Sequence, residues 1–452
     1  MKNFRRESTE LPELFIRELI QNVMDARVGI DGPAKIIVRL VDPTNGLKTE
    51  PFIGILSPLE PHLDAAGHKG ARDYTKPTAL IVEEFGTKGL TGKVDDSRAQ
   101  GESERWANFW HGEGKRSKQG KSLGRAGQGK ITYHMASAAQ ALLAYSVREG
   151  ASPSGVVFGK CIVQKSHQVG TDHYMRHGYW RREDPSKKLQ PLPADDDAFI
   201  ANFRQHFNLV RDKFDVGTSW VIPFPVNAFT KNTLLGAILK GFHFSFLKGA
   251  LEADICGQTI NKSNVDALTS QYVQSSVLAP AFIAFLQDVV RIDDKTIVTA
   301  KPDWKFSSGD VIDASAFIEA DLENLKTAFE AGKVVAARFP LQISRSDGTK
   351  VETSFKVYVS RPEGLTRTEE IYIRSDLVIT DEKWLKDVPG RALGAVIADD
   401  DPVSEFLGYA EEASHLKWTA AEDDLLSRYE RASARDALSR VRRALPRLCR
   451  LL

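Results

Sequence analysis

A helical pattern near the start of the chain constrains the fold more than any other feature of the sequence. Glu18, Asn22 and Asp25 are spaced so that, at about 100° per residue, an α-helix would place them within an arc of roughly 60°. Apolar residues surround them at Phe15, Ile16, Leu19, Ile20 and Val23. The spacing predicts an amphipathic helix that packs its apolar side on a sheet and presents two carboxylates and an amide to one ligand.

A strand followed by spaced glycines comes next. The apolar run at 77–82 predicts a buried strand, which ends in Glu83 and Glu84 and leads to Gly86 and Gly89. Glycines let a backbone approach a flat ligand, and a carboxylate accepts a hydrogen bond from an exocyclic amine. This combination is one way to hold adenine.

A second glycine cluster, formed by Gly124, Gly127 and Gly129, leads through Lys130 into a predicted helix from Ile131. Free N–H groups at a glycine-rich helix start, beside a lysine, favour phosphate binding. The spacing differs from that of the Walker P-loop, and no strand-turn-helix unit with a ribose-binding acid accompanies it. The sequence therefore predicts an anion site of another kind.

These motifs, in this order, resemble those of the GHKL ATPases, which include gyrase B subunits, MutL, ninety-kilodalton heat-shock chaperones, MORC proteins and sensor histidine kinases. The segment around Glu18 is similar to the family's N box, that after Glu84 to its first glycine box, and 124–130 to its second. The segment 217–223 looks like the Gly-Thr strand that closes the adenine pocket. The resemblance covers about half of the chain and is closest to prokaryotic MORC-like, MutL-like and chaperone-like members.

The resemblance implies ATP and Mg²⁺ as cofactors and a role for each matched residue. Glu18 would be the general base for the attacking water, Asn22 would hold the magnesium ion, and Asp25 would support the pocket. An amide oxygen suits magnesium, so hydrolysis would depend on this metal. The remaining matched residues would surround the nucleotide, with Glu84, Gly86, Gly89 and Thr218 at the adenine and Gly124, Gly127, Gly129 and Lys130 at the triphosphate.

The match departs from the family at the first glycine box. The family normally has an aspartate where this chain has Glu84, and the next Gly-x-Gly is stretched over 86–89. The longer acid needs about 1.5 Å of additional room, the length of one C–C bond. Glu83 is therefore an alternative contact for adenine.

The segment between the glycine boxes has the composition of a lid. Residues 92–123 are rich in Gly, Ser, Lys and Arg, with an aromatic island at Trp106, Phe109 and Trp110. A polar segment with one apolar anchor can fold over a bound nucleotide. A plain surface loop is the alternative.

Composition and charge limit the remaining functions. Lys and Arg number 61 and Asp and Glu 60, so binding to DNA would need a local basic patch and is not indicated by net charge. The three cysteines Cys161, Cys256 and Cys449 are far apart, which argues against a disulfide framework. No stretch approaches the roughly 20 apolar residues of a membrane span, and we expect a cytoplasmic protein without membrane contact.

A second metal site is not predicted. Cys161, His167, His173 and His177 lie close in sequence, but their spacing matches no common zinc finger. The only metal ligand expected is Asn22, through magnesium.

The second half of the chain alternates helices and strands, with a hairpin turn at 346–349. In the dimerising branches of the family a transducer domain sends a lysine to the γ-phosphate; Lys350 and Lys356 flank the hairpin, but no motif selects one. Leucines and a valine also form a helical seam at Leu438, Val441, Leu445, Leu448 and Leu452. This seam could pack on the chain itself, on a second copy or on a partner protein, with a basic membrane-surface helix as the weaker alternative.

We therefore expect an α+β protein in three parts. A Bergerat-type α/β sandwich that binds ATP would span 1–225, an α/β transducer-like domain 226–418 and an amphipathic helical tail 419–452. The expected function is ATP hydrolysis that drives lid closure and homodimerisation, as the ATPase of a multi-protein or DNA-directed system such as antiphage defence. A nucleotide-dependent switch without turnover is the alternative. A sensor kinase is disfavoured, because no phosphoacceptor histidine precedes the N box.

Overall fold

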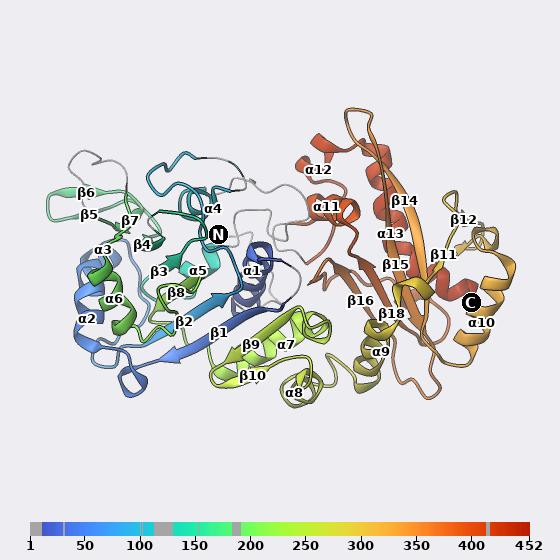
Figure 1. Ribbon diagram of the computed structural model, residues 1–452, viewed down its shortest axis with the longest axis horizontal. Coiled ribbons are helices and arrows are strands. Elements are labelled where there is room, and N and C mark those ends of the chain that lie inside the picture. The colour runs from blue at the N-terminus through green and yellow to red at the C-terminus, as the bar shows by residue number, and fades with distance from the viewer. Residues whose placement is uncertain are drawn as a thin grey trace. The chain divides into compact units, whose positions relative to one another are not determined.

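Two separate sheets organise the chain, one in each of two compact units (Figure 1). The computed structural model describes residues 11–29, 32–99, 101, 103–112, 130–152, 154–182, 191–412 and 416–452. Unit 1 holds the described residues up to 239 and again 249–268, and unit 2 holds 240–248 and 269–452. Helices, antiparallel strands and a few parallel pairs are mixed, so the predicted α+β class is confirmed.

The sheet of unit 1 has eight strands in the order β10-β9-β1-β2-β8-β3-β4-β7. Their bounds are β1 Ala34–Val41, β2 Ala79–Phe85, β3 Ala141–Val147, β4 Gly155–Ile162, β7 His177–Trp180, β8 Gly217–Pro223, β9 Leu251–Ile255 and β10 Gln258–Ile260. Neighbouring strands are antiparallel except β1 and β9, which are parallel. A separate hairpin is formed by β5 (His167–Val169) and β6 (Asp172–Tyr174).

The sheet extends beyond the boundary predicted at residue 225. Strand β9 pairs with β1, from Ala34 opposite Leu251 to Val38 opposite Ile255. A first domain of 1–225 would leave this edge of β1 with unpaired N–H and C=O groups. The boundary is corrected to residue 268, because the pairing joins strands that are distant in sequence.

Helices cover both faces of this sheet, and strand side chains alternate between them. Ile81, Leu143 and Val221 lie in a core on one face, which we call face B, whereas Trp220 lies on the opposite face A. Face A carries α1 (Leu11–Ala26), α4 (Arg105–Trp110) and α5 (Ile131–Met135), and face B carries α2 (Thr49–Leu56), α3 (Glu60–Ala65) and α6 (Asp197–His206).

Unit 2 is built on a six-stranded sheet with the order β11-β14-β15-β18-β16-β17. The predicted turn at 346–349 joins β14 to β15, with Ser344 opposite Lys350. The strand bounds are β11 Val298–Thr299, β14 Val335–Ser344, β15 Lys350–Ser360, β16 Glu369–Arg374, β17 Leu377–Val378 and β18 Leu393–Ala398. A small two-stranded sheet is formed by β12 (Phe306–Ser307) and β13 (Val311–Ile312).

The helices that follow residue 226 agree with the sequence pattern. Helices and strands alternate there, with α7 (Lys231–Leu247), α9 (Pro280–Arg291) and α10 (Glu319–Glu330) among the helices. Further helices are α8 (Val265–Tyr272), α11 (Asp401–Ala410), α12 (Asp423–Arg428) and α13 (Arg431–Leu451). In the part of the chain that the structure describes, none of the helices combines the length and apolarity of a membrane span.

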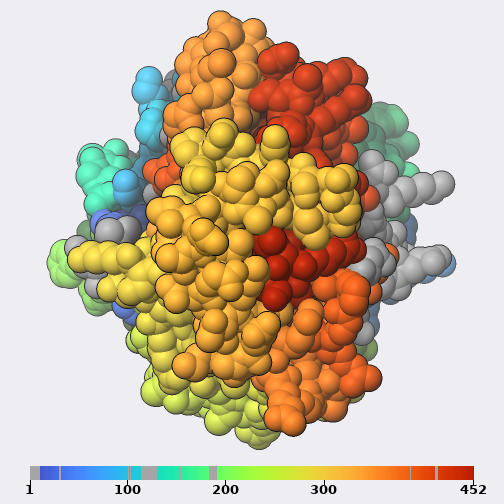
Figure 2. Space-filling view, turned by 90° about the vertical axis from the view of Figure 1, so that its right-hand side faces the viewer, coloured from blue at the N-terminus to red at the C-terminus, as the bar shows by residue number. Residues whose placement is uncertain are grey.

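The C-terminal seam packs on the chain itself. Val441, Leu445 and Leu448 of α13 are fully buried in unit 2, where the helix lies against β13, β14, β15 and β18. Leu445 lies so close to Gly394 that a Cβ there would be 2.7 Å from its methyl groups. Figure 2 shows the dark red end of α13 framed by yellow and orange parts of unit 2. The separate tail predicted at 419–452 is therefore part of unit 2.

Pro446 sits inside α13, although proline cannot donate the helical hydrogen bond. The acceptor left without its partner is the carbonyl oxygen of Arg442, four residues earlier. The hydroxyl of Tyr372 in β16 donates to this oxygen at 2.8 Å. A side chain of the sheet thus replaces the bond that the proline removes.

Candidate functional site

Helix α1 has the predicted polar face. Glu18, Asn22 and Asp25 are half-buried, whereas Leu19 and Val23 are fully buried. The amide nitrogen of Asn22 donates to Oε1 of Glu18 at 2.9 Å. The carboxylate and the amide are thus held together, with the amide Oδ1 as the atom suited to a cation.

Tyr133 of α5 lies between helix α1 and the sheet, with its ring centroid 5.1 Å from that of Phe15 in α1. Its side chain is fully buried beside Trp220, with ring centroids 5.4 Å apart. Burial raises the pKa of Tyr133 well above its ordinary value, the charges of Glu18 and Glu84 raise it further, and Asn22 beside the hydroxyl acts in the opposite direction. Glu18, Asn22 and Glu84 therefore lie within electrostatic range of one buried phenol.

Strand alternation separates the two glutamates of β2. Glu83 points to face B, where it accepts hydrogen bonds from Arg39 (2.8 Å), the Ser219 hydroxyl (2.9 Å) and the backbone N–H groups of residues 210 and 211 (both 3.0 Å). Its oxygens are thus occupied by structural bonds. Glu84 lies on face A, the side of α1, so it is the better placed of the two alternatives.

The carboxylate of Glu84 is almost completely buried. Burial raises the pKa of Glu84, while the charge of Arg211, a hydrogen bond from Thr218 and the charge of Arg105 oppose the shift. The sequence analysis places Glu84 and Thr218 at the same predicted adenine site, and in the structure the two side chains lie within hydrogen-bonding distance. A ligand amine would have to share this carboxylate with the groups that already surround it.

Arg211 is an important residue that the sequence analysis missed. Its guanidinium is fully buried and donates to the backbone oxygen of Thr218 (3.1 Å), to the hydroxyl of Ser219 (2.9 Å) and to the backbone oxygen of Glu84. These bonds tie the end of β2 to the start of β8. Arg211 lies in an irregular polar stretch without periodicity, so no pattern in the sequence indicates its role.

Arg105 was also missed, because it lies in the segment read only as a lid. It begins α4 and donates to the backbone oxygen of Asp25, in the last turn of α1. A cation at this position interacts favourably with the negative end of the helix dipole. Arg105 therefore connects α4 to the predicted N box.

Backbone conformation and packing partly explain why the first glycine box contains glycines. Gly86 and Gly89 both have positive φ, at 71° and 65°. A Cβ on Gly89 would lie 2.3 Å from the carbonyl oxygen of Val147 in β3, whereas one on Gly86 would have only ordinary contacts. The close approach that glycine permits at residue 89 is thus to the protein's own backbone.

These two glycines allow a matched stability test. Gly86→Ala should lower the free energy of unfolding of unit 1 by about 1 to 2 kcal/mol, because only the positive φ is strained. Gly89→Ala should cost roughly 1 to 3 kcal/mol more, because the methyl group also collides with β3. Urea unfolding measures both changes, and equal losses would contradict the close packing at Val147.

Lys130 is the only member of the second glycine box that the structure describes; Gly124, Gly127 and Gly129 lie outside the described residues. Its ammonium group donates to the carbonyl oxygens of Asn108 (2.6 Å) and Gly112 (2.7 Å), at the C-terminal end of α4. A cation at this end satisfies the last carbonyl groups of a helix. Lys130 thus connects the second box to the aromatic island.

The aromatic island of the predicted lid is an anchor in the core of unit 1. Trp106 and Trp110 are buried, and Phe109 lies with its ring centroid 4.5 Å from that of Trp220. Trp106 also contacts Phe158, at 5.3 Å between centroids. The tryptophans of the island are thus buried on face A, while residues 113–123 of the predicted lid lie outside the described residues.

Metal ligands are sparse in the described part of the chain, where no group of three His, Cys, Asp or Glu side chains is arranged to hold an ion. Cys161, His167 and His177 line a cavity on face B, and His173 is not among its lining residues. A magnesium ion at Asn22 would take its other ligands from phosphate and water oxygens, which is common for this metal.

Comparison with known proteins adds no family to this description. No family model matches the chain, and no curated protein matches it in sequence. The functional interpretation therefore depends on the residues and their geometry.

Proposed function

We propose that the chain binds ATP with magnesium on face A of unit 1 and hydrolyses it, as in the GHKL ATPases that its motifs resemble. One observation carries the proposal: Glu18 and Asn22 of α1, which are hydrogen-bonded to each other, and Glu84 of β2 all lie near enough to the buried Tyr133 to act on its pKa. These residues belong to two motifs that are distant in sequence. Their convergence is what a shared nucleotide site requires.

Glu18 is the proposed general base. Its carboxylate is half-buried and held by Asn22, so it is oriented to accept a proton from a water molecule. Asn22 would contribute one oxygen to a magnesium ion, which supplies charge stabilisation at the phosphates when bound. Asp25, on the same face of α1, would support the pocket.

The adenine side is proposed at Glu84 and Thr218. Ser146 of β3 supports this pair, because its hydroxyl lies 3.1 Å from that of Thr218 and accepts from the N–H of Leu90 at 3.0 Å. The loop after the first glycine box is thereby attached to β3. Lys130 would reach a phosphate only after leaving the carbonyl oxygens at the end of α4.

The wider role rests on the resemblance alone. We propose homodimerisation in the ATP-bound state and work as the ATPase of a multi-protein or DNA-directed cytoplasmic system, with antiphage defence as one example. A partner protein on the C-terminal helix has less support, because the seam of α13 is buried in unit 2.

The first experiment is calorimetric titration of ATP into the full chain with MgCl₂ or with EDTA, followed by an assay of phosphate release with and without DNA. Magnesium-dependent binding and release would support the proposal. Binding without release would favour the nucleotide switch. No binding in either condition would overturn the site assignment.

Tyr133→Phe tests the buried phenol of the proposed site. The hydroxyl makes no hydrogen bond to the residues that the structure describes, so it is available to a bound nucleotide or water. Loss of one such bond, worth about 1 kcal/mol, should lower phosphate release about fivefold. Tyr145→Phe is the control, because Tyr145 is equally buried but lies in the core of face B. Equal activity of the two variants would show that the Tyr133 hydroxyl has no part in the reaction.

A further inference from the structure

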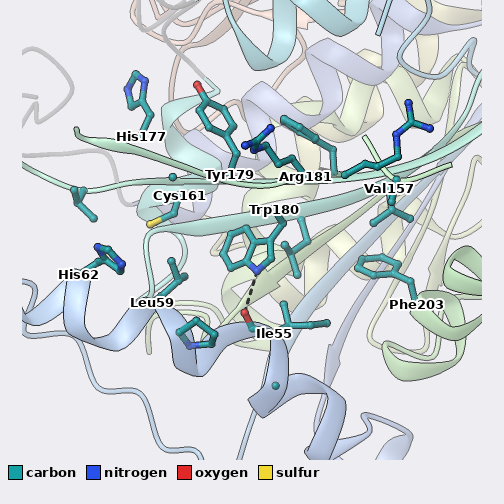
Figure 3. A pocket seen from close by; sticks show the side chains of 18 of the residues that line it. Ile55, Leu59, His62, Val157, Cys161, His177, Tyr179, Trp180, Arg181 and Phe203 are labelled. Atoms are coloured by element: carbon teal, nitrogen blue, oxygen red, sulfur yellow. Dashed lines mark hydrogen bonds between the residues drawn. The ribbon is translucent and has the colours of Figure 1, made fainter. Parts of the chain in front are cut away.

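A cavity of about 840 Å³ opens on face B of unit 1, on the other side of the sheet from the candidate nucleotide site. Its volume lies within the range of roughly 300 to 1,000 Å³ that is typical of small-molecule sites. The walls come from α2, η3 (Ser57–Leu59), α3, β4, β7 and α6 (Figure 3). The interior is mainly apolar, with Ile55, Leu59, Val157, Cys161 and Phe203.

The mouth of the cavity exposes apolar side chains. Tyr174, Met175 and Phe199 are 39%, 78% and 48% exposed, although they line an apolar cavity. Exposed apolar groups that continue into a cavity are typical of a binding site. Trp180 adds an apolar wall, because its indole N–H is already bonded to the carbonyl oxygen of Ile55 at 3.0 Å (Figure 3).

One polar pair converges on this apolar space. Nδ1 of His62 lies 2.9 Å from Nε2 of His167, and Nδ1 of His167 lies 3.3 Å from the carbonyl oxygen of Lys165. Figure 3 shows His62 and Leu59 rising from adjoining helical turns toward the strand that carries Cys161. The pair therefore supplies a hydrogen-bonding atom at the cavity wall.

The hydrogen-bond chain determines the tautomers of both rings. A carbonyl oxygen only accepts, so Nδ1 of His167 carries a proton, and in the tautomer with this single proton Nε2 is the acceptor. Nδ1 of His62 must then be the donor of the 2.9 Å bond. Burial lowers the pKa of His62 below its ordinary value, and the nearby His167 lowers it further, so both effects favour the neutral ring. Nε2 of His62 remains as a hydrogen-bond acceptor.

Four charged residues at the cavity have structural partners. Arg182 and Asp195 form an ion pair at 2.7 Å, and Asp196 caps α6 by accepting a backbone N–H at 2.8 Å. Arg176 is exposed and donates to a backbone carbonyl oxygen at 3.3 Å. Burial raises the pKa of Cys161 to about 12, so its thiol is protonated and unreactive.

We propose that this cavity binds an apolar small molecule with one hydrogen-bond donor, such as a medium-chain alcohol, whose hydroxyl donates to Nε2 of His62. A single side chain of a partner protein would fill too little of the space to account for its size. The site is independent of the proposed nucleotide chemistry, so either can fail without the other.

The test compares three probes by calorimetric titration of the full chain at pH 7.5. Decan-1-ol has the donor, methyl decyl ether lacks it, and decanoate replaces it with a charge. We expect decan-1-ol to bind roughly tenfold more tightly than the ether, the effect of one hydrogen bond. Equal affinities for alcohol and ether, or tighter binding of decanoate, would overturn the proposal.

Two variants locate the binding. Gly178→Leu should abolish it, because a Cβ at residue 178 points toward Cys161 at a contact distance of 3.9 Å and a longer side chain would fill the cavity. Gly32→Leu, at an exposed position with open space, is the matched control. His62→Phe should weaken decan-1-ol about tenfold and leave the ether unchanged.

Circular dichroism checks that each variant is folded. If Gly178→Leu fails to fold, His62→Phe decides alone, because it keeps a ring of similar shape at the cavity wall. Unchanged decan-1-ol affinity in His62→Phe, or in a folded Gly178→Leu variant, would place the binding elsewhere and overturn the assignment.

Discussion

Phosphate release by the Glu18→Gln variant should fall at least about a hundredfold, while the affinity for ATP stays within about threefold of the wild-type value. Glutamine keeps the length of the side chain, and its Oε1 can still accept from the amide of Asn22, as Oε1 of Glu18 does at 2.9 Å. It cannot accept a proton from water at neutral pH. The variant therefore removes the chemistry and retains the geometry.

The control is Glu13→Gln, which changes a half-buried carboxylate on the same helix. Glu13 is five residues from Glu18 and lies on another side of α1. Its replacement should leave turnover within about twofold of the wild type. Full turnover in Glu18→Gln would exclude Glu18 as the base, and loss of turnover in both variants would indicate general damage to the helix.

Unit 2 should be strongly destabilised by Arg374→Met, by about 3 to 5 kcal/mol. Arg374 and Glu411 form a bidentate ion pair in which the side chains are 0% and 1% exposed. Removal of the arginine leaves a carboxylate buried without its counter-charge. The double variant Arg374→Met/Glu411→Leu should recover most of the loss, because no uncompensated charge then remains.

Urea unfolding of the single and double variants measures this effect. Arg291→Met is the control, because Arg291 pairs with Asp288 on the surface, at 71% and 57% exposure. Such a pair should contribute less than about 1 kcal/mol. Equal stability losses for Arg374→Met and Arg291→Met would show that burial gives the inner pair no particular importance.

Local patterns in the sequence predicted much of the fold. The apolar and polar spacing of α1 and the turn between β14 and β15 depend on residues close in sequence, and both elements appear where they were expected. The pairing of β1 with β9, in contrast, joins residues that are more than 200 positions apart in sequence, so no local pattern predicts it. The hydrogen bonds of Ala34 and Val38 are completed by a strand made much later, so a boundary drawn at residue 225 was wrong.

In the candidate site, too, some contacts follow from local spacing in the sequence and others depend on tertiary packing. Glu18 and Asn22 are one helical turn apart, so their contact follows from spacing alone. The choice between Glu83 and Glu84 depends on which face of β2 meets α1, and this is decided by tertiary packing. Arg211 gives no periodic signal at all. Arg211 connects β2 and β8 by donating to backbone oxygens of both strands, and these oxygens become neighbours only in the folded chain.

The packing of α13 on the unit 2 sheet has a consequence for folding during translation. A ribosome synthesises β14, β15 and β18 before residues 431–451, so one face of the unit 2 sheet has no cover while these strands emerge. Gly394 and its neighbours stay accessible until Leu445 arrives to pack against them. During that interval the nascent sheet can associate with other chains. A chain whose translation stops before α13 would therefore be prone to aggregation, and it would not fold into a shorter stable protein.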